Sequence, residues 1–290
     1  MTQRKTYRLK LRTRELVLGP RTLVMGVLNL TPDSFSDGGK YLCVDEAVEA
    51  ALAMGRAGAD ILDIGAESTR PGSRGVSVVE ELARLLPVLE ALRGRLKIPI
   101  SVDTRKAAAA EVALGAGAEL VNDVSGLRHD PRLAEVAARH GAGLVLMHMR
   151  GTPETMQKLP FAKNVVRDVM GGLRRSITLA SGAGVAKSRI VVDPGIGFGK
   201  SFAQNYELLA KLPALAELGY PLLVGPSRKG FIGKALASRK RWSVPAEQRV
   251  WGTAATVAAS ILNGAHIVRV HDVTEMAQVA RVADAVLREG

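Results

Sequence analysis

The stretch IPISVDTRKAAAAEVALGAGAELVNDVSG, residues 98–126, decides the fold. It opens with a short apolar run at 98–102 and continues into a segment, 105–118, that is rich in the good helix formers Ala, Leu, Glu and Arg. A second apolar run follows at 120–121. A buried strand, a helix and another buried strand form the unit from which parallel sheets are built.

The same alternation extends from this stretch toward both ends of the chain. Eight short apolar runs recur, at 23–28, 61–64, 98–102, 120–121, 144–147, 190–192, 221–224 and 267–270. Helix-like segments at 45–59, 80–94, 105–118 and 130–142 separate several of them, and each has a glycine near its end, as helices often do. Eight units favour closure into a (β/α)8 barrel over a doubly wound sheet.

Length and composition agree with one large domain. The chain has 290 residues, of which 47% are hydrophobic but only 4% aromatic, so its core must be built mainly from aliphatic side chains. Residues 7–18 alternate between apolar and charged side chains, which favours a short hairpin. We therefore expect an α/β protein, a single (β/α)8 TIM barrel over residues 1–290, with residues 1–20 as a hairpin that closes one end.

Composition also bears on where the protein works. The single cysteine, Cys43, cannot form an internal disulfide, which favours a reducing compartment such as the cytoplasm. No run of 18 apolar residues is present, and no apolar segment typical of a signal peptide follows the basic N-terminus. We expect a cytoplasmic protein with no membrane partner.

The net charge of +12 permits a nucleic-acid partner, an anionic substrate or an Arg-rich surface. The excess is dispersed, apart from basic runs at 4–14 and 238–241, and neither run is interleaved with enough aromatic residues to stack bases. A solvated surface is therefore expected, without nucleic acid. A nucleic-acid binder would instead show strongly salt-sensitive affinity.

Polar residues follow the apolar runs, at the strand ends where barrels of this kind place their chemistry. Asn29 opens a loop, 29–39, whose Pro, Asp and Gly suit either an ordinary turn or a mobile active-site loop. The second run leads to Thr69 and Arg70, whose hydroxyl and guanidinium could bind an anion. Asp103, after the third run, is either a helix N-cap or a ligand contact.

The sixth run ends in DPGIGFGKS, residues 193–201, which suggests a phosphate loop. The spacing excludes this interpretation, because a P-loop ending at 199–201 needs glycine at position 194, which is Pro194. A dinucleotide-binding glycine motif fails as well, because position 200 is Lys200. No nucleotide motif remains.

The last two runs point to an anion. Loops after the seventh and eighth strands form the recurrent phosphate site of these barrels, and here they carry Lys229, Arg269 and His271. Opposite them, Asp103, Asn122 and Asp193 could pair with a guanidine-like or aminopyrimidine edge. The expected substrate has a phosphorylated end and a nitrogen-rich end.

Taken together, these motifs resemble the dihydropteroate synthases, folate-pathway enzymes that join a dihydropterin to p-aminobenzoate. The matching segments occur in order at 25–39, 63–72, 101–106, 122–126, 146–149, 193–200, 225–233 and 269–273. The resemblance implies transfer of the (7,8-dihydropterin-6-yl)methyl group from its diphosphate to p-aminobenzoate, with release of pyrophosphate. It also implies Mg2+ as cofactor and a homodimer. Leu30 and Ala66 depart from the residues more usual there, without removing a functional group.

The resemblance also implies roles for individual residues. It makes Asn29 the metal contact. It makes Asp103, Asp193 and Lys229 catalytic, and it assigns p-aminobenzoate to Thr69, Arg70, Pro71 and Ser227. The residues implied for the pterin diphosphate are Thr69, Asp103, Asn122, Asp193, Lys229, Arg269, Val270 and His271. Loops 31–39 and 66–75 would close over the substrates and exclude water.

Two related alternatives stay open. A corrinoid-dependent methyltransferase shares the barrel and part of the Asp and Asn set, but it has no diphosphate to release. The loops at 68–71 and 227–229 therefore favour the synthase. An inactive synthase-like barrel is disfavoured because the expected site residues are all present.

Overall fold

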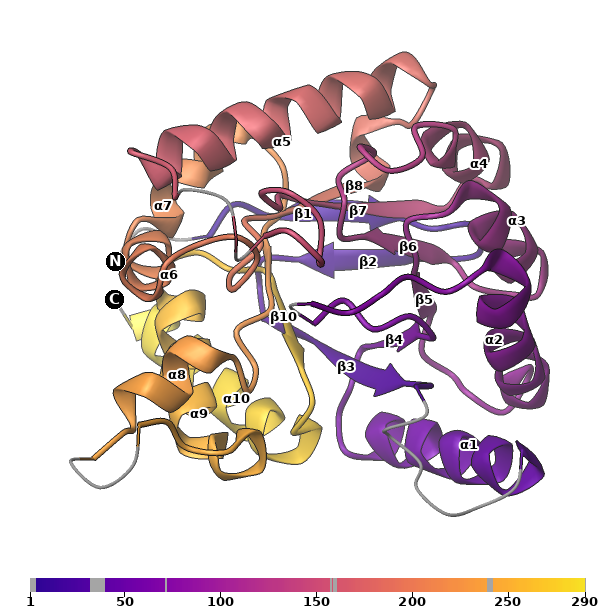
Figure 1. Cartoon of the computed structure of the whole chain (residues 1–290), viewed down its shortest axis with the longest axis horizontal. Coiled ribbons are helices and arrows are strands. Elements are labelled where there is room, and N and C mark those ends of the chain that lie inside the picture. The colour runs from indigo at the N-terminus through magenta and orange to yellow at the C-terminus, as the bar shows by residue number, and fades with distance from the viewer. Residues whose placement is uncertain are drawn as a thin grey trace.

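Eight parallel strands form the centre of the computed structural model, which describes residues 4–31, 40–70, 72–156, 158, 161–238 and 242–289. Neighbouring strands follow the order β8-β7-β6-β5-β4-β3-β10-β9, and a parallel bridge between Val192 and Leu222 joins the two edges, so the sheet closes into a barrel (Figure 1). The strands are β3 (Leu23–Asn29), β4 (Ile61–Gly65), β5 (Ile100–Asp103), β6 (Leu120–Asp123), β7 (Gly143–Met147), β8 (Ile190–Asp193), β9 (Leu223–Val224) and β10 (Ile267–Val270). The predicted fold class is confirmed.

Helices alternate with the strands and surround the barrel (Figure 1). They are α1 (Lys40–Arg56), α2 (Val78–Leu92), α3 (Ala107–Gly115), α4 (Leu133–His140), α5 (Val165–Gly182), α6 (Phe202–Ala210), α7 (Leu212–Leu215), α8 (Gly230–Ala235), α9 (Val250–Leu262) and α10 (Val273–Glu289). The N-cap of α3 is Lys106, so Asp103 is the last residue of a strand and not a cap. The cap interpretation of Asp103 is thereby excluded, and its contact with a ligand stays a prediction.

Two separate cores show which way each strand residue faces. Val102, Val121 and Val192 belong to the large core between strands and helices. Strand neighbours point to opposite faces, so Asp103, Asn122 and Asp193 face the barrel interior. A smaller interior core of Leu, Ile, Val and Met side chains lies at the other end of the barrel. The polar residues therefore form a layer above an apolar floor.

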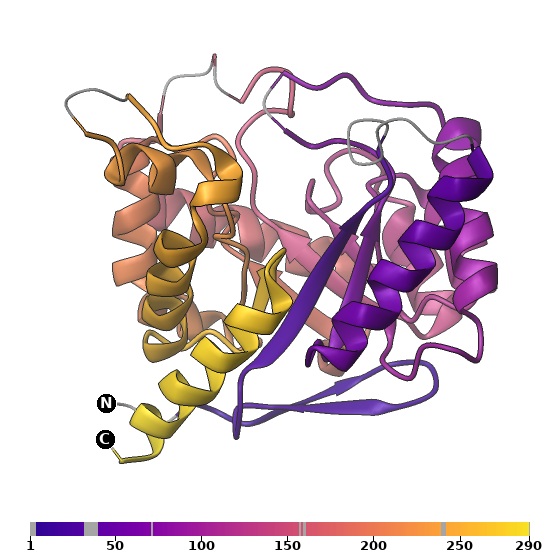
Figure 2. The same ribbon diagram turned by 90° about the horizontal axis from the view of Figure 1, so that it is seen from below.

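The N-terminal hairpin closes that floor. Strands β1 (Tyr7–Lys10) and β2 (Glu15–Leu18) pair antiparallel, and Leu9, Leu11 and Leu18 join the interior core. Figure 2 shows the hairpin in indigo lying across the end of the barrel opposite the long loops. The predicted closing hairpin is confirmed, and substrates must therefore reach the barrel interior from the other end. Among the described residues no helix has the length and apolarity needed to cross a membrane.

Candidate active site

The centre of the polar layer is an arginine held between two carboxylates. Arg269 on β10 donates from Nε to Asp63 Oδ2 at 2.6 Å and from Nη2 to Asp103 Oδ2 at 2.8 Å. Asn122 on β6 donates from Nδ2 to the same Asp63 oxygen at 3.0 Å. Four strands, β4, β5, β6 and β10, thus contribute to one hydrogen-bonded group at the barrel mouth.

Burial raises the proton affinity of the Asp103 carboxylate. Asp103 is 8% exposed, and burial raises the pKa of its carboxyl to about 7, with Arg269 opposing and Asp63 adding to the rise. A carboxyl that changes charge near neutrality is a frequent property of catalytic sites. Burial also raises the pKa of Asp193.

The end of β8 brings a carboxylate and a lysine together. Asp193 Oδ1 accepts a hydrogen bond from the Gly195 amide at 2.7 Å, which fixes the start of the following loop. Lys229 donates from Nζ to the Ile196 carbonyl at 2.5 Å and lies 4.0 Å from the centroid of the Phe198 ring. Burial lowers the pKa of Lys229 to about 7, while the charge of Asp193 partly opposes this.

Gly197 creates the space that the lysine occupies. Its φ is +84°, and a Cβ built there would lie 2.5 Å from Lys229 Cδ. Any other L-residue would be both strained and in contact with the lysine stem. The loop that first suggested a nucleotide motif therefore has another use: its glycine lets Lys229 reach the site.

A second buried lysine supports the same loop. Lys200 donates from Nζ to the carbonyls of Gly195 at 2.9 Å, Phe198 at 3.0 Å and His148 at 3.2 Å. Burial lowers its pKa to about 7 and lowers that of His148 to about 2, so His148 stays neutral beside it. Because three carbonyls occupy its ammonium, Lys200 shapes the loop and does not face a ligand.

The β9 and β10 ends join through Ser227 and His271. Ser227 Oγ accepts from the His271 amide at 3.2 Å and lies 3.0 Å from His271 Nδ1. Burial lowers the pKa of His271 to about 4, so the ring is neutral at neutral pH. Arg228, between Ser227 and Lys229, has a left-handed φ of 57° and is paired with Asp272. The turn thereby directs Ser227 and Lys229 toward the mouth while Arg228 is engaged elsewhere.

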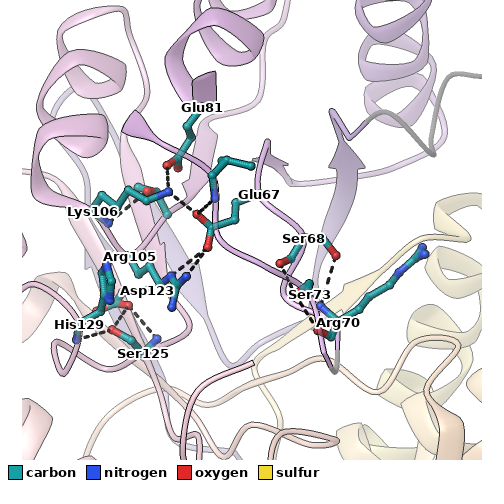
Figure 3. A network of polar contacts seen from close by, with 12 residues as sticks. Glu67, Ser68, Arg70, Ser73, Glu81, Arg105, Lys106, Asp123, Ser125 and His129 are labelled. Carbon is teal, nitrogen blue, oxygen red and sulfur yellow. Dashed lines mark hydrogen bonds and ion pairs between the residues drawn. The ribbon is translucent and has the colours of Figure 1, made fainter. Parts of the chain in front are cut away.

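The loop after β4 carries Thr69 and Arg70. Ser73 holds its bend by donating from Oγ to the carbonyls of Ser68 at 2.6 Å and Arg70 at 2.7 Å. Thr69 is partly buried and Arg70 exposed. Figure 3 shows the Arg70 side chain extending away from the charged cluster around Glu67. Pro71, most of the 31–39 loop, and positions 239–241 of the second basic run lie outside the described residues.

Asn29 ends β3, where it pairs with Gly65 in the strand register. Among the described residues no group of three or more His, Cys, Asp or Glu side chains could hold a metal ion. A single amide oxygen is a weak metal site by itself. Mg2+ usually keeps several waters and is bound through one or two carboxylates together with substrate phosphates, so Asn29 as its ligand stays a prediction.

The structure brings together much of what the sequence predicted, with additions. Asp103 and Asn122 join Arg269 around Asp63, which was not among the candidates because it lies inside an apolar run. Its position, two residues after Ile61 on the inward face, was the available signal. Val270 packs in the outer core between Arg269 and His271, so only its backbone can reach a ligand in the mouth.

Comparison with known proteins gives a consistent result. The sequence matches the pterin binding enzyme family over residues 25–271. The dihydropteroate synthase of Synechocystis sp. is 50% identical over 93% of this chain and 92% of its own length. That of Bacillus subtilis is 47% identical over 93% and 90% of the two chains.

Solved structures agree with these sequences. The Xanthomonas albilineans dihydropteroate synthase with 4-aminobenzoic acid has a TM-score of 0.89 and 44% identity, and the match covers 97% of this chain and 98% of that one. A Yersinia pestis dihydropteroate synthase in a sulfonamide complex has a TM-score of 0.89 and 43% identity, with 98% and 100% covered. The likeness extends over essentially the whole barrel.

Proposed function

This chain belongs to the pterin-binding enzyme family, and from that premise we propose how its barrel mouth performs the reaction of the dihydropteroate synthases. The enzyme is a transferase that condenses (7,8-dihydropterin-6-yl)methyl diphosphate with p-aminobenzoate, giving 7,8-dihydropteroate and pyrophosphate in folate biosynthesis. The observation that carries the residue roles is the inward-facing polar layer around Arg269.

The pterin end is formed by Asp103, Asn122, Asp193 and Lys229. Carboxylates accept hydrogen bonds from ring N–H and amino groups, whereas an amide side chain and an ammonium donate to ring nitrogens and a carbonyl. Asp103, Asn122 and Asp193 are buried, which limits competition from water and strengthens each such bond. A flat heterocycle with alternating donors and acceptors fits this set.

The diphosphate end is formed by Arg269 and His271. Arg269 connects the two ends, since its guanidinium is bonded to Asp63 and Asp103 of the pterin layer. His271 is neutral and can donate a hydrogen bond to a phosphate oxygen without carrying charge. Lys229, at the pterin end, would supply a positive charge beside Asp193.

The reaction needs no covalent nucleophile from the protein. The amine nitrogen of p-aminobenzoate attacks the pterin-methyl carbon, the carbon–oxygen bond to the diphosphate breaks, and the amine loses a proton. Arg269 and His271 stabilise the negative charge on the departing diphosphate, while Asp103 and Asp193 stabilise the positive charge that develops on the pterin. Catalysis is then electrostatic and positional.

We further propose Mg2+ as the cofactor, with Asn29 as its protein ligand. The support is the oxygen chemistry of this amide at the end of β3 and the lack of a closed protein-only metal cluster among the described residues. When bound, Mg2+ would neutralise diphosphate charge and make it a better leaving group.

The second substrate is assigned to the loops above the pterin. Thr69, Arg70 and Pro71 would contact p-aminobenzoate from the loop after β4. Ser227 would do so from the β9 end, although its hydroxyl is already engaged by His271. Covering the site with these loops and with residues 31–39 would keep water from competing with the amine.

A homodimer and a cytoplasmic location complete the proposal. The single cysteine is the support for a reducing compartment. Support for the dimer comes from large exposed apolar side chains on α6 and α9, two helices that contact each other. They include Tyr206 and Trp251, and Trp251 is 80% exposed. Sedimentation of the purified chain would test this assembly.

Turnover by the purified chain tests the proposed function. With the pterin-methyl diphosphate, p-aminobenzoate and Mg2+, we expect dihydropteroate and pyrophosphate to form in equal amounts. Chelation of divalent metal should reduce the rate, and Mg2+ should restore it. Methyl transfer from a corrinoid would favour the methyltransferase alternative, and absence of any product would favour the inactive barrel.

The pH dependence of kcat/KM for the pterin diphosphate should be bell-shaped with a maximum near neutrality. Acid protonates Asp103, whose pKa is about 7, and alkali deprotonates Lys229, whose pKa is also about 7. Because kcat/KM reports groups of the free enzyme, both losses should appear in it. Arginine stays charged at high pH, so Lys229→Arg should remove the decrease of kcat/KM on the alkaline side. A flat profile of the wild type between about pH 5 and 9 would contradict the assignments of Asp103 and Lys229.

A further inference from the structure

Glu67 lies at the centre of a buried charge cluster that the proposed mechanism does not use. Its Oε1 accepts from Arg105, at 2.9 Å from Nε and 2.6 Å from Nη2, and its Oε2 is paired with Lys106. The same lysine lies 2.6 Å from Glu81 Oε2 on helix α2. Figure 3 shows these four side chains converging between the β4 loop, the end of β5 and α2.

The cluster is buried and balanced in charge. The side chains of Glu67 and Glu81 are 6% and 1% exposed, and two carboxylates face two cations. Burial alone would raise the pKa of Glu67, but the hydrogen bond from Lys106 and the charge of Arg105 lower it below its usual range. Buried ion pairs add little net stability compared with apolar packing, and in some proteins they serve to select one arrangement of the chain.

The arrangement selected here is that of the loop after β4. Glu67 precedes the loop, and its Oε2 also accepts from the amide of Val76 at the far end, at 3.4 Å. A Cβ on Gly75 would lie 2.9 Å from Arg105 Nη2, so the returning chain passes directly against the cluster. The Glu67 carboxylate is therefore next to both ends of the loop that carries Thr69 and Arg70.

The other partners of Glu67 belong to the pterin end. Arg105 and Lys106 follow Asp103 by two and three residues, and the amide of Thr104, between Asp103 and Arg105, donates to the Asn122 carbonyl at 3.2 Å. The cluster thus joins the loop assigned to the second substrate to the strand end assigned to the pterin. Loss of Glu67 would leave both elements intact but free to shift relative to each other.

We propose that Glu67 is a positioning residue that fixes the Thr69–Arg70 loop in register with Asp103, and so sets the affinity for the aromatic amine. What the loop binds rests on the proposed function, whereas its anchoring does not. Glu67→Gln keeps the shape of the side chain and removes its charge. Glu111→Gln is the matched control, because Glu111 is also paired with two basic side chains, Arg139 and His140, but at the surface.

Two measurements separate positioning from a merely structural role. In Glu67→Gln we expect KM for p-aminobenzoate to rise about tenfold while KM for the pterin diphosphate stays within about twofold, as loss of a charge-assisted hydrogen bond would produce. We also expect trypsin to cut the Arg74–Gly75 bond about tenfold faster, because the end of the loop opens more often. Mass spectrometry would measure the rate of this cleavage. Glu111→Gln should match the wild type in both.

An equal loss for both substrates, or unchanged cleavage at Arg74, would overturn the proposal. If Glu67→Gln does not fold, Arg105→Lys decides, because it keeps the charge but loses the forked hydrogen bonding. Faster cleavage at Arg74 with an unchanged Tm then supports the proposal, and unchanged cleavage refutes it. The cleavage result stands even if the chain makes no dihydropteroate, so failure of the proposed function would be recognised separately.

Discussion

Replacing Lys229 with Met should lower kcat/KM for the pterin diphosphate by about 100-fold to 1,000-fold, the range found when one preorganised electrostatic group is removed from an active site. Lys229 is half-buried, and its ammonium lies at the Ile196 carbonyl and over the Phe198 ring. Met retains most of the stem volume, so the space beside Gly197 stays filled. The loss should therefore come from the missing charge.

Lys234→Met is the matched control for this variant. Lys234 is exposed on α8, where its ammonium lies 3.5 Å from the centroid of the Trp242 ring, and it has no role in the site. Steady-state kinetics of both variants, with thermal unfolding to confirm that they fold, would make the comparison. A Lys229→Met enzyme with wild-type kcat/KM would remove the lysine from the site.

Asp63→Ala should cost about 3–5 kcal/mol of unfolding free energy, the range for removing one partner of a buried ion pair. Asp63 is fully buried and accepts from Arg269 and Asn122. Its loss leaves the Arg269 guanidinium with only Asp103 and leaves the Asn122 amide without this acceptor. We expect activity to fall as well, because Arg269 loses the contact that orients it.

Urea unfolding monitored by circular dichroism would measure the change. Asp45→Ala, at an exposed position of α1, makes the same substitution without a buried partner and should change the free energy of unfolding by less than about 0.5 kcal/mol. If Asp63→Ala is as stable as this control, the Asp63–Arg269 pair does not hold the layer together.

The architecture could be predicted because its strands and helices depend on residues that are close together in the sequence. Apolar runs of strand length alternate with helix formers along the chain, and Gly141 adopts the left-handed conformation expected at a helix end, with a φ of 60°. Alternation within each strand then places Asp103, Asn122 and Asp193 inside the barrel. The hairpin at Tyr7–Lys10 and Glu15–Leu18 followed from the same kind of pattern.

Contacts that depend on closure of the barrel could not be predicted in this way. Asp63 and Arg269 are 206 positions apart and meet only because β3 joins β4 to β10. An aspartate inside an apolar run has no local signal of its partner. The cluster of Glu67 with Arg105 and Lys106 depends likewise on the packing of β4 against β5.

The division of the mouth into a pterin end and a diphosphate end is the central claim, and one titration series tests it. Calorimetry would compare the pterin with and without its diphosphate, in the wild type, Asp193→Asn and His271→Ala. We predict that Asp193→Asn weakens both ligands by about tenfold or more, whereas His271→Ala weakens only the diphosphate ester. Equal losses for both ligands in His271→Ala, or unchanged pterin affinity in Asp193→Asn, would contradict the account.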